Sequence, residues 1–551
     1  MRASLVSSLA VGCATALALP LSLTAPTPAA AAAPGPRLAP ALAPTAPDAP
    51  DADVAGSTQS LPLEPLAPDG PRNRAGGRTA AGERGLTRSE VRPFSLVGVV
   101  WDDARAPLDG TVQVRSRSTA DGTWSRWRDV ETHNEEHGAD PGTVEDRGAA
   151  PRGGTAPLWV GASDGVEVRV RPGQDDRHDR HERAGELPRG LRLELVDPGR
   201  EPERTTSTRA MGAPADGGGG GVAAPYTHYT GYPGYPGYTG QFTRPYPVGG
   251  HTSSGSGQPG QPGKSSQSGK PGKQGQSGKP GKPSRPSQSG QSGPAGESEK
   301  AEQAVRKATA AAESAGANAE LAPYGVSSIP AQTHAQTVAS LHKAPGAKPY
   351  IGARPKIVTR KGWGADEGLR EGGFSYTKTV KAAFVHHSAT GNSYKCGEAA
   401  SVLRGIYRYH VKSMHWRDIG YNFAVDKCGT IYEGRAGGVA KAVQGAHTMG
   451  FNSDSMGIAV LGSYGSTNPP AAAVTAIARL TAWKLGLFEA NPKGKTTLTS
   501  GGGNRFKKGS KVKLNVISGH RDGFSTECPG KRLYGKLGTA RSASAKYQGR
   551  S

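Results

Sequence analysis

The chain has 551 residues, of which 80 are glycine and 44 are proline, and only 34 % are hydrophobic. A chain of this length has room for several domains, but this composition excludes a packed core along the whole of it. We therefore expect two folded domains and a long unfolded remainder. The formal net charge of +22 indicates an anionic partner or an anionic setting.

The N-terminus has the composition of a secretory signal peptide. Arg2 precedes the apolar run LVSSLAVGCATALALPLSL, and a run of alanines ends at Ala33. This pattern predicts a cleaved segment over residues 1–33 and a secreted protein, extracellular or associated with the cell wall. Cys13 offers a lipid attachment site as an alternative, but the apolar run continues well beyond it. No later stretch is apolar enough to predict a transmembrane segment.

The next part of the chain changes from an irregular to an alternating pattern. Residues 34–89 are rich in Ala, Pro, Arg and Asp and lack periodicity, which predicts a disordered leader. Residues 90–198 contain alternating apolar and polar residues in TVQVRSRS, VEVRV and LRLELVD. Alternation of this kind is typical of half-buried strands, so we expect a small all-β domain of unknown role. A polar loop at residues 133–154 interrupts it.

Four tryptophans fall within this predicted β domain, at Trp101, Trp124, Trp127 and Trp159. They could form a sugar-binding platform, although packing in the core is the commoner use of tryptophan in strands. The sequence leaves both uses open.

Residues 199–350 have the composition of a low-complexity linker. The stretch GYPGYPGYTG is followed by an imperfect Gly/Pro/Ser/Gln/Lys repeat, in which glycine never persists at every third position. A flexible tether is therefore expected rather than a collagen helix, and it would let two domains move independently. A short helix near its end, in ESEKAEQAVRKATAAAESAG, is expected to have no packing partner.

The charge of this linker bears on partners. Six lysines and arginines lie between Lys264 and Arg285, with no acidic residue among them. They predict a solvated, self-repelling tether that can also attract anionic cell-wall polymers. A nucleic-acid partner does not fit a secreted protein whose basic residues lie in a linker.

Residues 351–540 alternate between strand and helix patterns. Strands are predicted for TVKAAFVHHS, YNFAVD, TIYEG, MGIAVLGSY and LNVISGH. A helix is predicted for EAASVLRGIYRYHVK, and Pro469 and Pro470 begin a second helix with Gly486 near its end. Helices that cover a mixed central sheet define an α/β domain. Residues 541–551 are predicted to be a tail.

The cysteines of the mature chain are odd in number. Removal of the signal segment would leave Cys396, Cys428 and Cys528 in an oxidising compartment, so one thiol needs another role. A bond between Cys396 and Cys428 would tie a helix to the sheet. A bond between Cys396 and Cys528 is the alternative.

Cys528 lies eight residues after His520 and is a candidate metal ligand with it. Zinc accepts thiolate and imidazole, and a catalytic zinc site uses three protein ligands. The third candidate comes from the adjacent pair His386 and His387, of which only one can enter a given site because strand neighbours point to opposite faces. A metal in such a site polarises a carbonyl and activates water near neutral pH. Each histidine taken alone is more often a structural or surface residue.

The motifs of the C-terminal region resemble those of one known family. Between Trp363 and Tyr534 the chain contains, in order, GWGAD, FVHHSATG, YRYHVKSMHWRDIGYNFAVDKCGTIYEGR, GAHTMGFNSDSMGIAVLGSY, SGHRDGFSTECPG and LY. Together they resemble the peptidoglycan recognition protein family, the zinc N-acetylmuramoyl-L-alanine amidases that include the phage lysozyme-type amidases. The β domain more loosely resembles the module that precedes actinobacterial members of this family.

The resemblance implies roles for individual residues. It places zinc ligands at His386, His520 and Cys528, with His387 facing away or toward an outer shell. It implies that Tyr421 and Thr526 are catalytic, and it supports the disulfide between Cys396 and Cys428. The positions that would line a peptide groove are Asn422, Arg435, His447 and Asn452. A simple surface ion pair is the alternative for Arg435.

The resemblance also implies an activity. The expected protein is a secreted hydrolase with Zn²⁺ as its one cofactor, cleaving the bond between the lactyl group of N-acetylmuramic acid and L-alanine in bacterial peptidoglycan. Non-catalytic members keep the groove but lack the cysteine ligand, so a peptidoglycan receptor or wall-tethered adhesin is the alternative. Residues 488–514 are longer and more basic than the family's pattern and bear on one wall of the groove.

Overall fold

The computed structural model describes residues 56–66, 82–132, 137–146, 150–173, 186–200, 294–341 and 349–551. The chain divides into two compact units, residues 1–51 and 52–551, and all the described residues belong to the second unit. The predicted signal segment and the basic repeat of the linker lie outside the described residues. Within the described ranges, no helix combines the length and the apolar character needed to span a membrane.

The N-terminal part of the second unit is an antiparallel β-sheet domain, so the predicted all-β class is confirmed. The strands are β1 (Ser57–Pro62), β2 (Glu64–Pro65), β3 (Arg84–Arg88), β4 (Phe94–Trp101), β5 (Gly110–Ser118), β6 (Arg128–Val130), β7 (Gly153–Gly154), β8 (Leu158–Pro172) and β9 (Arg192–Asp197), with a short 3₁₀ helix at Val144–Asp146. Their order is β1-β9-β4-β8-β3-β2, with β5 on β8, β6 on β5 and β7 on β4.

This sheet begins earlier than the sequence suggested. Strands β1, β2 and β3 lie within residues 34–89, so the prediction of a disordered leader is wrong for them. β1 pairs with β9 from Ser57 to Pro62, and β3 pairs with β8. The pairing partners lie far along the chain, and sheet edges can recruit short segments whose own sequence lacks a strand pattern.

The tryptophans divide between two uses. Trp101 is buried in the sheet core, and Trp159 is buried in a second cluster described below. Trp127 lies beneath the guanidinium of Arg169, 3.6 Å from its ring centroid, and Arg115 lies over both Trp124 and Trp127. Core packing thus accounts for one pair, and stacking with arginine accounts for the other.

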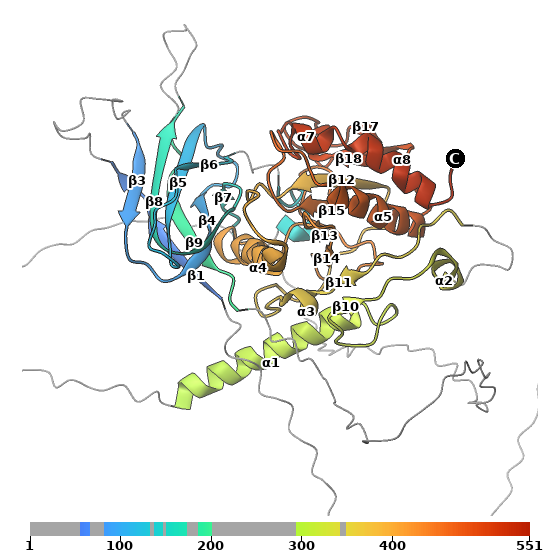
Figure 1. The fold of residues 1–551 in the computed structure, drawn as a ribbon, viewed down its shortest axis with the longest axis horizontal. Coiled ribbons are helices and arrows are strands. Elements are labelled where there is room, and N and C mark those ends of the chain that lie inside the picture. The colour runs from blue at the N-terminus through green and yellow to red at the C-terminus, as the bar shows by residue number, and fades with distance from the viewer. Residues whose placement is uncertain are drawn as a thin grey trace, which may run out of the picture. The chain divides into compact units, whose positions relative to one another are not determined.

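The C-terminal part is an α/β domain with a mixed central sheet, as predicted (Figure 1). Its strands are β10 (Ser328–Ile329), β11 (Ile357–Val358), β12 (Ala382–His387), β13 (Phe423–Val425), β14 (Ile431–Glu433), β15 (Ser455–Val460) and β18 (Ile517–Gly519), in the order β10-β11-β14-β13-β15-β12-β18. β12 runs parallel to both β15 and β18. A separate hairpin of β16 (Lys495–Thr499) and β17 (Lys511–Asn515) forms the basic insertion.

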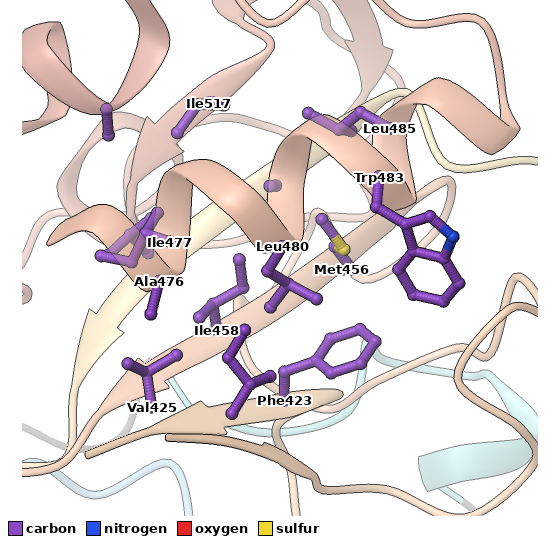
Figure 2. Packing of buried hydrophobic residues seen from close by; sticks show 14 of the residues in the cluster. Phe423, Val425, Met456, Ile458, Ala476, Ile477, Leu480, Trp483, Leu485 and Ile517 are labelled. Carbon is purple, nitrogen blue, oxygen red and sulfur yellow. The ribbon is translucent and has the colours of Figure 1, made fainter. Parts of the chain in front are cut away.

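Helices flank this sheet. They are α2 (His334–Ala339), α3 (Arg360–Trp363), α4 (Ala399–Arg408), α5 (Ala471–Leu487), α6 (His520–Gly523), α7 (Lys531–Tyr534) and α8 (Leu537–Tyr547), with a 3₁₀ turn at Cys396–Glu398 and a π turn at Tyr409–Ser413. In α5, Ile477 and Leu480 are fully buried over Ile458, and Phe423 of β13 belongs to the same cluster (Figure 2). This apolar layer fixes β15 and hence its parallel neighbour β12.

Two segments predicted to be loose are packed. Helix α1 (Pro294–Gly316) was expected to have no partner, but Arg370 donates to the Ala310 carbonyl and pairs with Glu313 near its C-terminal end. The predicted tail at 541–551 is largely helical and belongs to α8, and Gln548 donates to the Ala482 carbonyl of α5 at 3.0 Å. In both segments, polar contacts hold the helix against residues that are distant in the sequence.

The two domains share one apolar core, so the expectation that they move independently is wrong. Leu96 and Val100 of β4 belong to the same buried cluster as Leu403 and Ile406 of α4. Tyr409, which follows α4, is fully buried, and its hydroxyl donates to the Thr155 carbonyl at 3.1 Å. Buried apolar side chains from both domains therefore pack against one another.

The predicted disulfide between Cys396 and Cys428 is present and closes a loop of sequence separation 32. We expect its removal in a Cys396→Ser/Cys428→Ser double variant to lower the free energy of unfolding by about 3–4 kcal/mol, because the unfolded chain gains loop entropy. Urea unfolding without reductant measures the difference. The unaltered protein in reductant should match the double variant, and equal stability of variant and oxidised parent would contradict the expectation.

Lys484 of α5 makes stability depend on pH. Its ammonium is buried and donates to the Val439 and Lys441 carbonyls, and burial lowers its pKa to about 7. Between pH 7 and the ordinary lysine pKa, the unfolded chain therefore binds more protons, so this residue raises stability as pH rises. We expect the gain in unfolding free energy from pH 7.5 to 9 to be smaller in Lys484→Met. Parallel urea titrations of both proteins measure it, and equal gains would contradict the assignment.

Candidate metal centre

Three predicted ligands converge at one edge of the C-terminal sheet. His386 lies near the end of β12, and His520 follows directly after β18. Because β12 and β18 are parallel, their carboxyl ends meet at the same edge, where ligand sites of open α/β sheets commonly lie. Cys528 reaches this edge through the loop between α6 and α7, where its backbone N–H donates to the Thr526 hydroxyl at 3.1 Å.

The side chains of these residues are buried and close together. The Cys528 Sγ atom lies 3.8 Å from His386 Nδ1, and the ring centroids of His386 and His520 are 4.4 Å apart. The cluster has a fourth member that the sequence analysis missed, His137 from the β domain. One ligand atom from each of the four residues lies within 4.8 Å of the others.

The chemistry of this cluster fits a zinc ion. Burial lowers the pKa of His386 well below its usual value and that of His137 to about 3, so both imidazoles are neutral, the form that binds metals. Among the described residues, neither ring nitrogen of His137 has a hydrogen-bond partner, although the ring is buried. A buried imidazole without a partner is costly, and coordination would remove that cost.

His387 occupies the opposite face of β12, as strand alternation requires. Its Nε2 atom lies 3.2 Å from a carboxylate oxygen of Glu131, and its Nδ1 accepts the Tyr464 N–H at 3.3 Å. His387 therefore joins β12 to the β domain rather than entering the ligand cluster.

The two residues expected to act in catalysis lie beside the cluster. Tyr421 is buried, with its ring centroid 5.4 Å from that of His386 and 5.7 Å from that of His137. Thr526 is partly exposed and caps the turn that carries Cys528. Tyr421 thus borders the candidate metal position. Thr526 instead contacts the backbone of Cys528, in the loop that carries this candidate ligand.

The four predicted groove residues have different surroundings. Asn422 is engaged internally, since its amide donates to the Val443 carbonyl and accepts from the Gly457 N–H. The ring of His447 is fully buried, and its centroid lies 5.3 Å from that of His386. Asn452 accepts the N–H groups of His447 and Thr448.

Arg435 is ion-paired, but it is not a surface residue. Its side chain is only 5 % exposed and pairs with Glu145 of the β domain. The Nε atom donates to the Ile419 carbonyl at 2.9 Å. The alternative of a surface ion pair for Arg435 is therefore wrong, because the pair is buried.

Residues from the β domain complete the surroundings of the site, and sequence reasoning missed them. The most direct contacts come from Glu131, His137, Asp140 and Glu145. These residues are far from the family motifs in the sequence. The one available signal was a pair of histidines among acidic residues in HNEEHGADPGTVED, inside a loop that interrupts the strand pattern.

Fold and site together define an α/β domain with a buried cluster of imidazoles and a cysteine side chain at the carboxyl edge of its sheet. Each of the two domains matches a known protein family. Residues 376–531 match the N-acetylmuramoyl-L-alanine amidase family, and residues 44–189 match a family described as Rv3811 N-terminal galactose-binding domain-like.

Individual relatives cover the C-terminal domain. Peptidoglycan-recognition protein SC2 of Drosophila simulans is 32 % identical over 185 residues, which are 33 % of this chain and 85 % of that protein. The peptidoglycan recognition protein of Trichoplusia ni is 29 % identical over 182 residues, with the same two shares. The chain therefore belongs to the peptidoglycan recognition protein family.

Two solved structures are similar to part of the chain. Human PGRP-IBETAC, in complex with glycosamyl muramyl pentapeptide, is 28 % identical, with 33 % of this chain and 94 % of that one covered and a TM-score of 0.27. Peptidoglycan recognition protein-LE, in complex with tracheal cytotoxin, is 29 % identical, with shares of 33 % and 92 % and a TM-score of 0.26.

Proposed function

We propose that this protein is a zinc-dependent N-acetylmuramoyl-L-alanine amidase that cleaves bacterial peptidoglycan. The observation that carries the proposal is the buried cluster of His386, His520 and Cys528, three donors of the kinds that catalytic zinc sites use. Family membership supports an amidase-type protein and peptidoglycan as the class of ligand. When bound, zinc would polarise the scissile carbonyl and make water nucleophilic near neutral pH.

The chain's own residues supply the remaining chemistry. Tyr421 lies beside the cluster, where its phenolic O–H would donate to the oxygen that becomes negative as the amide is attacked. Thr526 would hold the loop of Cys528 and help to position the substrate. The guanidinium of Arg435 is suited to a carboxylate of the peptide stem, since its present partner is itself a carboxylate.

The alternative is a peptidoglycan receptor or wall-tethered adhesin without turnover. It would use the same groove, but it has no need of a thiolate ligand. The buried position of Cys528 against His386 therefore favours the hydrolase. We propose a secreted location on the signal-like N-terminus and on the disulfide, which persists in oxidising compartments. Attraction of the basic linker to anionic wall polymers belongs to the same proposal.

The test follows release of free N-terminal L-alanine from purified peptidoglycan. Because His137 lies among the ligands, the assay is run on the zinc-loaded full chain and on His137→Ala. We expect release by the variant, its loss on chelation and its return with zinc. A His137→Ala/His520→Ala double variant should release none. Binding of peptidoglycan without release by either protein, with zinc present, would make the chain a receptor.

A further inference from the structure

One segment of the β domain lies on the residues that are proposed to bind metal and substrate. It consists of residues 137–146 and is called the blocking segment here. Three of its side chains contact three different parts of the site: His137 the ligand cluster, Asp140 the wall formed by Asn452, and Glu145 the cation Arg435.

The first contact closes the ligand set. The ring of His137 lies beside both a proposed metal ligand and the proposed catalytic tyrosine, with its centroid 4.5 Å from that of His520 and 5.7 Å from that of Tyr421. Its ring nitrogens are buried, and neither has a hydrogen-bond partner in the described part of the chain. A catalytic zinc site keeps one position open, whereas four protein ligands make a closed, structural type of site.

The second contact occupies polar groups on one wall of the groove. Oδ1 of Asp140 accepts both the Asn452 amide at 2.7 Å and the Gly450 N–H at 2.7 Å. The Gly138 carbonyl accepts from the same Asn452 amide at 2.8 Å. Donors that could bind an extended substrate are therefore already bound to the chain itself.

The third contact satisfies the cation. Glu145 pairs with Arg435 and also with Arg417, at 3.3 Å, and its side chain is 6 % exposed. Burial by itself would raise the pKa of Glu145, but the charge and hydrogen bond of Arg435 oppose it and the pKa of this carboxyl is lowered overall. A carboxylate from a peptide stem would have to displace Glu145 in order to reach the guanidinium.

The blocking segment is held in place by the interface around it. Before it, Glu131 contacts His387, and after it the Arg152 N–H donates to the Met414 carbonyl at 3.1 Å. The shared apolar core lies beneath, between β4 and α4. The segment is therefore anchored on both sides rather than resting loosely on the surface.

From these contacts, we propose that His137 is a fourth metal ligand and that residues 137–146 keep the site latent by occupying it as a substrate would. This inference rests on the proposed function and concerns its regulation. Substrate gains access when the segment leaves, which frees one coordination position, Asn452 and Arg435 together.

The test uses the full chain loaded with cobalt(II) in place of zinc, since the visible spectrum of cobalt reports the number and kind of its ligands. We expect His137→Ala to change this spectrum, because water replaces an imidazole. His334→Ala, which removes an exposed histidine of α2, is the matched control and should leave the spectrum unchanged. A spectrum unaltered by His137→Ala, or a chain that takes up no cobalt, would overturn the assignment.

A second measurement follows access to the groove without any turnover. The affinity for a soluble muramyl peptide is measured by calorimetry on the unaltered chain, His137→Ala, Glu145→Gln and His334→Ala. Loss of one contact of the competing segment should tighten binding by at least about tenfold in His137→Ala and in Glu145→Gln. Equal affinities in all four proteins would overturn latency. Tighter binding without alanine release would leave latency standing and reject the amidase instead.

Discussion

Replacing Cys528 with alanine is expected to lower the affinity of the chain for zinc by more than about 100-fold. In the His137→Ala background, the same change is expected to abolish the release of L-alanine. Loss of an outer partner of a metal ligand already costs about 10–100-fold in affinity, and Cys528 is proposed as a direct ligand. Its thiol is fully buried beside His386, so no neighbouring side chain can move in without repacking. Competition with a chromophoric chelator measures the affinity.

The matched control for this change is Ser525→Ala, in the same loop, where the side chain is exposed. It should leave zinc affinity and activity unchanged. The outcome that would remove Cys528 from the ligand set is equally tight zinc binding by Cys528→Ala, with the fold preserved by circular dichroism. In that case the thiol would be a packing residue.

Replacing Tyr421 with phenylalanine is expected to lower kcat by about 100–1000-fold, the effect typical of losing one donor to a developing oxyanion. The ring contact with His386 would remain, because phenylalanine keeps the ring. Zinc content and affinity for a muramyl peptide should therefore stay the same. The comparison is made within the His137→Ala background, where the contact of the blocking segment with the ligand cluster is removed.

Tyr376→Phe serves as the control, since that hydroxyl donates to the Gly437 carbonyl and lies outside the ligand cluster. It should retain the full rate. A parallel fall of zinc content and rate in Tyr421→Phe would show that the tyrosine supports the metal centre rather than the reaction.

Local pattern and motif were sufficient to predict much of the C-terminal domain. The helix expected from the prolines at 469 and 470 is α5, and the strand ending in His386 and His387 is β12. Alternation along β12 also separated the roles of the two histidines. These predictions succeeded because each depends on neighbours within a few residues, or on a motif that resembles one of the family.

The contribution of the β domain to the site could not be predicted in this way. His137 comes from an acidic loop without periodicity, and its approach to His520 depends on how two domains dock. That docking depends on Tyr409 and Leu403, which read in the sequence as ordinary core residues of an amphipathic helix. Nothing in the periodicity of a helix indicates which distant strand covers its apolar face.

The shared core changes what a break in the chain would do. After a cut between residues 201 and 293, β4 and α4 would still bury one another's apolar side chains. The two products should therefore travel as one particle in size-exclusion chromatography and separate only in denaturant. A chain cut in this region would thus still hold the blocking segment, residues 137–146, in the site.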